Sequence, residues 1–224
     1  MTFSIVARCA QTGMFGVAVS SSSPAVAARC AHARAGIGAV ASQNITDPAL
    51  GTRALDLMRS GASASQAIDV LRSSANFMNY RQLLIVDARG QSAIHSGSEA
   101  LGVWAEAKNE NVACGGNLLA DAGVPAAMVT AFLASEGHLG DRLLIAMRGA
   151  LQAGGEAGPV HSAGLQIVDK ASWPVADIRV DWTEGCPITE LSTVWDIYKP
   201  QLDAYVARAL NPSVAPSYGV PGDP

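Results

Sequence analysis

The sequence predicts an α+β fold in which two antiparallel β-sheets stack on each other and helices cover their outer faces. Runs of apolar, β-type residues recur in closely spaced pairs, which favours antiparallel hairpins. Helical segments lie between these strand pairs along the chain. Stacking the sheets beneath helices gives every run a buried face. We therefore expect a four-layer α-β-β-α sandwich.

Three strand pairs support this prediction. The first joins residues 2–8 to residues 14–20 across a loop that ends at Gly13. Glycine tolerates the positive φ of a short hairpin loop, so this pair should form at the centre of a sheet. The second and third pairs join residues 82–87 to 91–95 and residues 164–169 to 176–181.

The helices have recognisable ends. Asp47 precedes a proline and is expected to cap a helix that runs to Gly61. Ser63 and Gln66 have the spacing of a capping box, which predicts the start of the next helix. Further helices are expected at about 125–135, at 139–153 and from Pro187 onward, the last one kinked at Pro200.

Composition limits the organisation and the partners. With 224 residues, 49% of them hydrophobic, the chain is expected to form one domain over residues 1–210, followed by a Pro/Gly-rich tail over residues 211–224. A net charge of −4 lacks the basic excess that nucleic-acid binding requires. Only 15% of the residues are charged, which leaves apolar surface for another subunit, so we expect a homodimer.

The sequence also argues against a membrane protein and against a metal site. The strongest apolar run, residues 83–86, is far shorter than the roughly 18 residues of a membrane span. The amino terminus lacks the pattern of a signal peptide, so a cytoplasmic location is expected. The four cysteines and four histidines have no metal-ligand spacing. We therefore expect no metal and no other cofactor.

One motif points to a different class of enzyme. Gly36, Gly38 and Ala41 match the G-x-G-x-x-A pattern of dinucleotide-binding proteins, and Asp56 follows at a suitable distance. Such a site needs a strand before the glycines and a helix that starts within them. Here the next helix is expected only at Pro48. A glycine-containing buried strand is the favoured interpretation of this segment.

Thr2 is the residue with the most distinctive chemistry. It follows the initiator Met and opens the first predicted strand. If Met1 is removed, the hydroxyl group of Thr2 lies beside its own α-amine, which titrates near pH 8 and can act as a base. This arrangement is that of an N-terminal nucleophile.

Several motifs occur in a characteristic order: residues 2–7 (Thr-Phe-Ser-Ile-Val-Ala), residues 36–43 (Gly-x-Gly-Ala-Val-Ala-x-Gln) and residues 116–119 (Gly-Asn-Leu-Leu). Together they resemble a bacterial family, domain of unknown function 1028. The resemblance extends over about residues 2–206, but residues 158–163 depart from the family's pattern. It implies the N-terminal-nucleophile (Ntn) hydrolase fold, itself a four-layer α-β-β-α sandwich, and hydrolysis of the C–N bond of a small-molecule amide.

The resemblance also implies roles for single residues. Thr2 would be the nucleophile and Ser20 would orient it. Asn117 would hold the oxyanion, a role that Gln43 or Asn44 could also fill. The remaining candidates would bind substrate or, for the arginines, favour the neutral amine: Arg29, Arg34, Gln43 and Asn44. The alternative function is a non-catalytic protein of the same fold that binds a small ligand or serves in assembly. Such a protein has no need of a free amine on Thr2.

Overall fold

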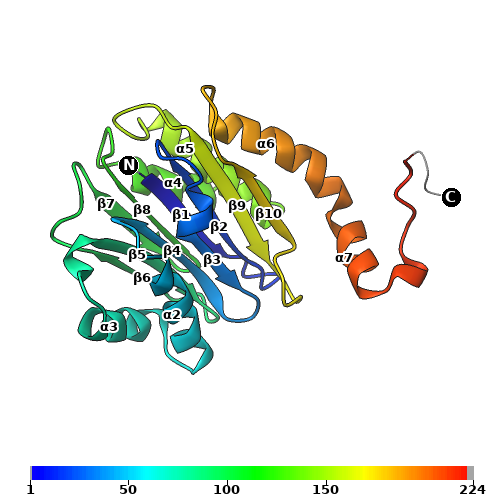
Figure 1. Cartoon of the computed structure of the whole chain (residues 1–224), viewed down its shortest axis with the longest axis horizontal. Coiled ribbons are helices and arrows are strands. Elements are labelled where there is room, and N and C mark those ends of the chain that lie inside the picture. Colours follow the sequence, from blue (N-terminus) through cyan, green and yellow to red (C-terminus); the bar gives the residue numbers. More distant parts are fainter. Residues whose placement is uncertain (1, 221–224) are drawn as a thin grey trace.

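The computed structural model describes residues 2–220, and the strands in this part of the chain form two antiparallel sheets (Figure 1). A six-stranded sheet has the order β10-β9-β2-β1-β8-β7, and a four-stranded sheet has the order β3-β4-β5-β6. The strands are β1 (Thr2–Arg8), β2 (Phe15–Ser21), β3 (Ala31–Arg34), β4 (Gly38–Asn44), β5 (Arg81–Asp87), β6 (Ser92–Ser96), β7 (Ala105–Asn109), β8 (Val112–Asn117), β9 (Ser162–Val168) and β10 (Ala176–Val180).

Helices cover the outer face of each sheet, which confirms the four-layer α-β-β-α sandwich (Figure 1). On the four-stranded sheet lie α2 (Pro48–Arg59) and α3 (Ala64–Ser74). On the six-stranded sheet lie α4 (Val124–Leu133), α5 (Leu139–Gln152) and α6 (Pro187–Tyr198). A third apolar cluster fills the space between the two sheets, and Val6, Leu84 and Ala113 contribute to it.

The first strand pair is confirmed at the centre of the larger sheet. β1 pairs with β2 on one side and with β8 on the other. Side chains alternate between the faces of a strand. Phe3 and Ile5 therefore pack against the helix layer, whereas Ser4 and Val6 face the other sheet. Thr2 shares the face of Ser4, so it points toward the space between the sheets.

The predicted helix ends are also confirmed. The Asp47 carboxylate accepts a hydrogen bond from the backbone N–H of Ala49 at 3.0 Å. Ser63 and Gln66 form the reciprocal capping box that opens α3. The expected kink occurs at Pro200, where a 3-10 turn (Lys199–Gln201) separates α6 from α7 (Leu202–Leu210).

Some elements of the structure were not predicted from the sequence. No element was predicted for α1 (Ala27–Cys30), β3, β7 or β8. Within the tail, Pro212–Val214 forms a 3-10 turn, and residues 221–224 lie outside the described residues. Gly36 lies between β3 and β4, and Gly38 begins β4, which pairs with β5 and is not followed by a helix until Pro48. This is the buried strand favoured above. None of the helices described is long and apolar enough to cross a membrane.

Candidate functional site

Thr2 lies at the amino end of the central strand, between two polar neighbours. The strand register pairs it with Asn117 on β8. On the other side Phe3 pairs with Ser20, so the residue opposite Thr2 on β2 is Ser21. The Thr2 hydroxyl donates to the Ser21 Oγ at 3.4 Å, and Thr2 is only 6% exposed. The hydroxyl is thus held in a buried, polar position.

The structure places Ser21, and not the expected Ser20, beside Thr2. Ser20 faces the opposite side of the sheet, and its hydroxyl donates to the backbone carbonyl of Ser162 at 3.0 Å. The predicted strand ends at residue 20, but β2 runs to Ser21. Because side chains alternate along a strand, a shift of one residue exchanges the two faces.

A short series of hydroxyl groups connects Thr2 to Arg29. The Ser21 Oγ lies 2.9 Å from the Ser23 Oγ. The Arg29 guanidinium donates to that same Ser23 oxygen at 3.2 Å and to the backbone carbonyl of Pro24 at 2.8 Å. Arg29 comes from α1, the short helix that follows this turn. Its positive charge therefore lies two hydroxyl groups from Thr2.

On the other side of Thr2, Asn117 belongs to a buried amide network that joins the two sheets. The Asn117 amide donates to the Gln82 Oε1 at 3.4 Å, and the Gln43 amide donates to the same oxygen at 2.7 Å. The Ser4 hydroxyl donates to the Gln43 Oε1 at 2.5 Å. The structure thus brings Gln43 and Asn117 together, with Thr2 next to Asn117 in the sheet.

Gln82 is a member of this network that the sequence analysis did not single out. It lies two residues before Leu84 and four before Val86 on β5, on the face that packs against the other sheet. A lone polar side chain on an otherwise apolar strand face was a signal that could have identified it.

The other two substrate-binding candidates lie outside this network. Asn44 adopts a positive φ of 75°, donates to the Tyr80 carbonyl at 2.6 Å and accepts from the Leu101 N–H at 3.1 Å. It thereby ties two loops together at the end of β4.

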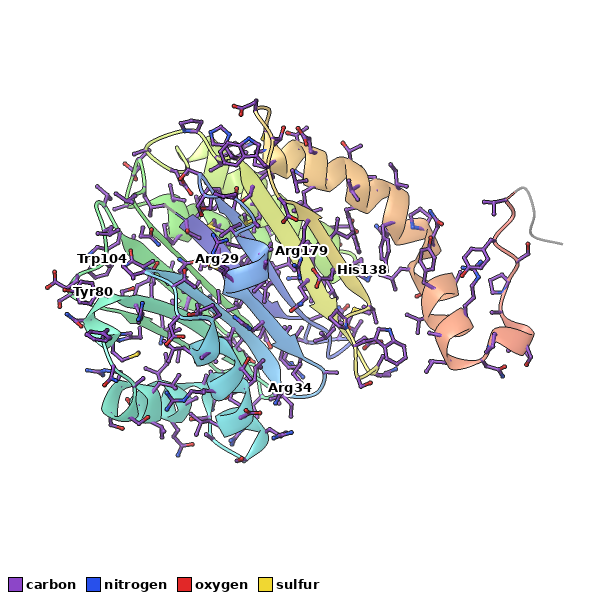
Figure 2. The ribbon with its side chains drawn as sticks, in the orientation of Figure 1. Arg29, Arg34, Tyr80, Trp104, His138 and Arg179 are labelled. Atoms are coloured by element: carbon purple, nitrogen blue, oxygen red, sulfur yellow. The ribbon has the colours of Figure 1, made fainter. Side chains whose placement is uncertain are left out.

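Arg34 forms an ion pair with Asp56 at 2.8 Å and pairs with Gly38. It lies at the opposite end of β4 from Gln43, about 16 Å along the strand. Figure 2 shows Arg34 well separated from Arg29. Of the two arginines, only Arg29 is connected to Thr2.

A buried carboxylate beside Ser22, the residue that follows β2, had no signal in the sequence. Glu156 follows two glycines in the loop between α5 and β9 and is only 6% exposed. Its Oε2 accepts from the Ser22 N–H at 3.3 Å, and its Oε1 has no hydrogen-bond partner among the residues described. Burial raises the pKa of Glu156 to about 7, although the Ser22 hydrogen bond and His161 oppose the shift.

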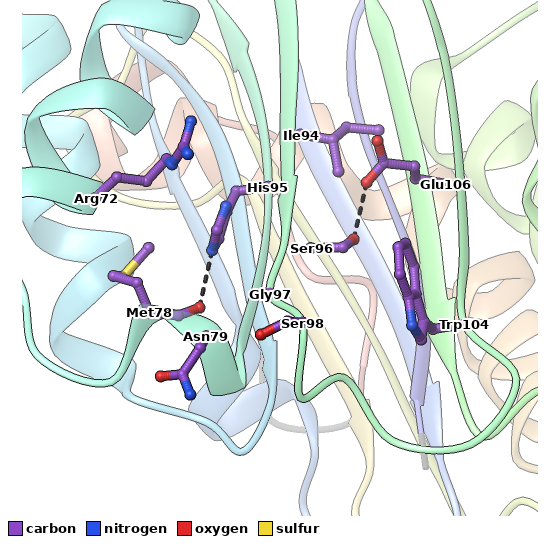
Figure 3. A pocket seen from close by; sticks show the side chains of 10 residues that line it. All are labelled: Arg72, Met78, Asn79, Ile94, His95, Ser96, Gly97, Ser98, Trp104 and Glu106. Atoms are coloured by element: carbon purple, nitrogen blue, oxygen red, sulfur yellow. Dashed lines mark hydrogen bonds between the residues drawn. The ribbon is translucent and has the colours of Figure 1, made fainter.

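A pocket of about 540 Å³ opens at the edge strands β6 and β7 (Figure 3). His95, Ser96, Trp104 and Glu106 are among its lining residues. The Ser96 hydroxyl donates to the Glu106 carboxylate at 2.8 Å and accepts from the Gln82 amide at 2.9 Å. Gln82 thus connects the wall of the pocket to Asn117. No role was predicted for these residues from the sequence.

Among the residues described, no group of three or more histidine, cysteine, aspartate or glutamate side chains is arranged to hold a metal ion. The site is built from hydroxyl groups, amides, one buried carboxylate and one arginine. Such a set can position a nucleophile, donate hydrogen bonds to an oxyanion and transfer protons.

Comparison with solved structures gives matches of unequal similarity. A crystal structure of protein SPO2555 from Silicibacter pomeroyi, matched to the DUF1028 family model, is 28% identical; the match covers 88% of this chain and 89% of that one, with a TM-score of 0.82. Anbu (ancestral beta-subunit) from Yersinia bercovieri is 13% identical, with 91% and 97% of the chains covered and a TM-score of 0.41. An Anbu (Gly-1) mutant from Hyphomicrobium sp. strain MC1 is 12% identical, with 92% and 99% covered and a TM-score of 0.44.

Comparison with curated proteins gives no match. The model of a family of unknown function, DUF1028, matches residues 2–191, which is most of the chain. This match agrees with the similarity to the Silicibacter pomeroyi structure. The chain belongs to the DUF1028 family.

Proposed function

We propose that the protein is an Ntn-type hydrolase that cleaves the C–N bond of a small-molecule amide, with Thr2 as the nucleophile once Met1 has been removed. The observation that carries the proposal is the position of Thr2. It opens the central strand, its hydroxyl bonds to Ser21, and its register partner is Asn117, whose side chain can donate hydrogen bonds.

In the proposed reaction, the Thr2 Oγ attacks the amide carbonyl carbon and forms a C–O bond, while its proton passes to the Thr2 α-amine. N–H donors, among them the Asn117 amide, stabilise the resulting oxyanion. The C–N bond then breaks, and the ammonium returns the proton to the leaving amine. Water hydrolyses the ester that remains and releases Thr2.

Two surrounding features support these roles. The Arg29 charge, connected through Ser23 and Ser21, favours the neutral form of the amine, which is the form that accepts a proton. The pocket lined by Trp104 lies beside Asn117, because Ala105 pairs with Gly116 and Trp104 precedes it. The pocket therefore offers space for the part of the substrate that does not react.

Removal of the nucleophile tests the proposal. With Met1 removed, as verified by intact mass, wild type and Thr2→Ala are assayed on a panel of small amides and ureides. Thr2→Ala should lose activity by several orders of magnitude, whereas Thr52→Ala, on the exposed surface of α2, should keep it. Equal turnover by wild type and Thr2→Ala would overturn the proposal.

A second candidate function is ligand binding without turnover on the same fold. The burial of Thr2, only 6% exposed, favours it, because a nucleophile must be reached by its substrate. In that case no amide is hydrolysed by the Met-free protein, and ligand affinity is the same in wild type and Thr2→Ala.

A further inference from the structure

Glu156 lies on the line along which β1 would continue beyond Thr2. The Ala157 N–H donates to the Leu118 carbonyl at 3.0 Å, and the Ala120 N–H donates to the Gly155 carbonyl at 3.0 Å. Residues 155–157 therefore run beside the chain that follows β8. They lie on the side that β1 occupies, because the N–H groups of Leu118 and Leu119 bond to the β7 side.

The side chain of Glu156 reaches the other neighbour of β1. Its Oε2 accepts from the N–H of Ser22, the residue that follows β2. A group that contacts both the chain after β8 and the chain after β2 lies at the amino end of the strand between them. That strand is β1, and its first residue is Thr2. The carboxylate therefore lies at the end of the sheet where Thr2 begins β1.

Burial makes this placement chemically significant. A carboxylate that is 94% buried is unfavourable when charged unless a donor or a positive charge compensates it. The single Ser22 N–H leaves the Oε1 without a partner in the part of the chain that the structure describes. Among the described residues, the titratable side chain that opposes the effect of burial on the Glu156 pKa is His161, in the segment leading into β9. Its ring Nδ1 is already engaged with the Thr183 carbonyl at 2.8 Å.

We propose that Glu156 binds the α-amino group of processed Thr2 and positions this amine as the base that accepts the Thr2 hydroxyl proton. The assignment rests on the proposed N-terminal-nucleophile function and adds a residue to it. In the charged form of the site, the Thr2 ammonium donates to the free Glu156 oxygen. When the ammonium gives up its proton, the neutral amine remains in place beside the Thr2 hydroxyl. Glu156 is a positioning residue, since it acts through the amine.

The test is a titration of the Thr2 α-amine, which requires no substrate. The Met-free chain is labelled with ¹³C-threonine, and the Thr2 Cα shift is followed against pH in wild type, Glu156→Gln and Glu156→Asp. A neighbouring carboxylate favours the ammonium. The amine pKa should therefore fall by about one unit or more in Glu156→Gln, a tenfold change in the protonation equilibrium, and by less in Glu156→Asp. Glu110→Gln, at an exposed turn, is the matched control and should leave it unchanged.

Each remaining outcome is informative. An unchanged amine pKa in Glu156→Gln overturns the assignment. If that variant fails to fold, the titration of the wild type decides. A Thr2 Cα chemical shift that changes in two pH steps, one for the amine and one for Glu156, supports contact between them. A single step contradicts it. If the amine is the base, the acidic limb of kcat/KM should move to lower pH with the amine pKa. If Glu156→Gln lowers the amine pKa but the wild type hydrolyses no amide, the proposed function alone is refuted. If the wild type hydrolyses an amide but Glu156→Gln leaves the amine pKa unchanged, the role of Glu156 alone is refuted.

Discussion

Asn117 and Gln82 belong to different sheets, yet the Asn117 amide donates to the Gln82 Oε1 at 3.4 Å inside the sandwich. The same oxygen accepts from Gln43, so one buried acceptor fixes two donors. Buried amides of this kind are stabilising only when their partners are present, because an unpaired buried polar group retains its full desolvation cost. The network therefore couples the stability of the sandwich to the geometry around Thr2.

The first prediction concerns this acceptor. Gln82→Met should lower the free energy of unfolding by about 1–3 kcal/mol, since it leaves the amides of Gln43 and Asn117 without their common partner. The measurement is urea unfolding at neutral pH. Gln91→Met, in the exposed turn before β6, is the control and should change the free energy of unfolding by less than about 0.5 kcal/mol. A Gln82 variant as stable as wild type would contradict the importance of the network.

The second prediction concerns the oxyanion. In the Met-free protein, Asn117→Ala should lower kcat by roughly a hundred- to a thousand-fold, which is the usual effect of removing one oxyanion donor. Steady-state kinetics on the best amide of the panel measures it, with circular dichroism to verify the fold. Asn76→Ala, at an exposed position after α3, is the control. If kcat is unchanged and only KM rises, Asn117 contacts the ground state and not the oxyanion.

The third prediction is a pH dependence of stability. The folded-state pKa of Glu156, about 7, is raised above its ordinary value of 4.5. Between these values the folded protein binds more protons than the unfolded chain, so wild type should lose stability as pH rises from about 4.5 to about 7. The loss relative to Glu156→Gln should reach at most about 3 kcal/mol.

Urea unfolding of wild type and Glu156→Gln at a series of pH values measures this effect. The difference between them should grow through the interval and level off above it. Glu110→Gln should show no such trend, since this side chain is exposed. A constant difference across the interval would mean that the Glu156 carboxyl group is not forced to ionise in a buried site.

The fourth prediction is self-association. Exposed apolar side chains gather at one end of the sandwich, where Asn44 ties the Tyr80 and Leu101 loops together. Tyr80 and Trp104 both lie at this end (Figure 2). Val103 is 47% exposed and Trp104 is 40% exposed. We propose that a second subunit covers this surface and expect a homodimer.

Light scattering should give about twice the chain mass of 23.0 kDa. Val103→Glu should shift the protein to the monomer, because it places a charge in the apolar surface. Val70→Glu is the matched control: it makes the same substitution at an exposed valine on α3 and should leave the dimer intact. A wild type of 23.0 kDa at micromolar concentration would rule out the proposed dimer.

Local signals explain which elements could be predicted. The Asp47 cap, the Ser63 capping box and the Gly13 loop each depend on residues that are close in sequence, and all three occur in the structure. The strand β7, Ala105–Asn109, was missed because alanine, glutamate and lysine are unfavourable in strands. Its pairing with β8 supplies the stability that its own residues do not.

The site was less predictable, because its contacts depend on register and on distant segments. Thr2, Gln43 and Asn117 were selected from motifs and lie in the same region of the structure. Ser20 and Ser21 are adjacent in sequence, and only the paired register shows which of them faces Thr2. The position of Glu156 depends on a loop more than 150 residues away from Thr2. No local pattern contains that information.

The central position of β1 determines whether the backbone of Thr2 is ordered before or after a ligand binds. A strand with paired neighbours on both sides opens only when one of them detaches, which places β1 among the segments of highest local stability. Its backbone amides should exchange with solvent only on global unfolding. The Thr2 backbone is therefore fixed before any ligand arrives, and the ordering of this residue adds no entropic cost to binding.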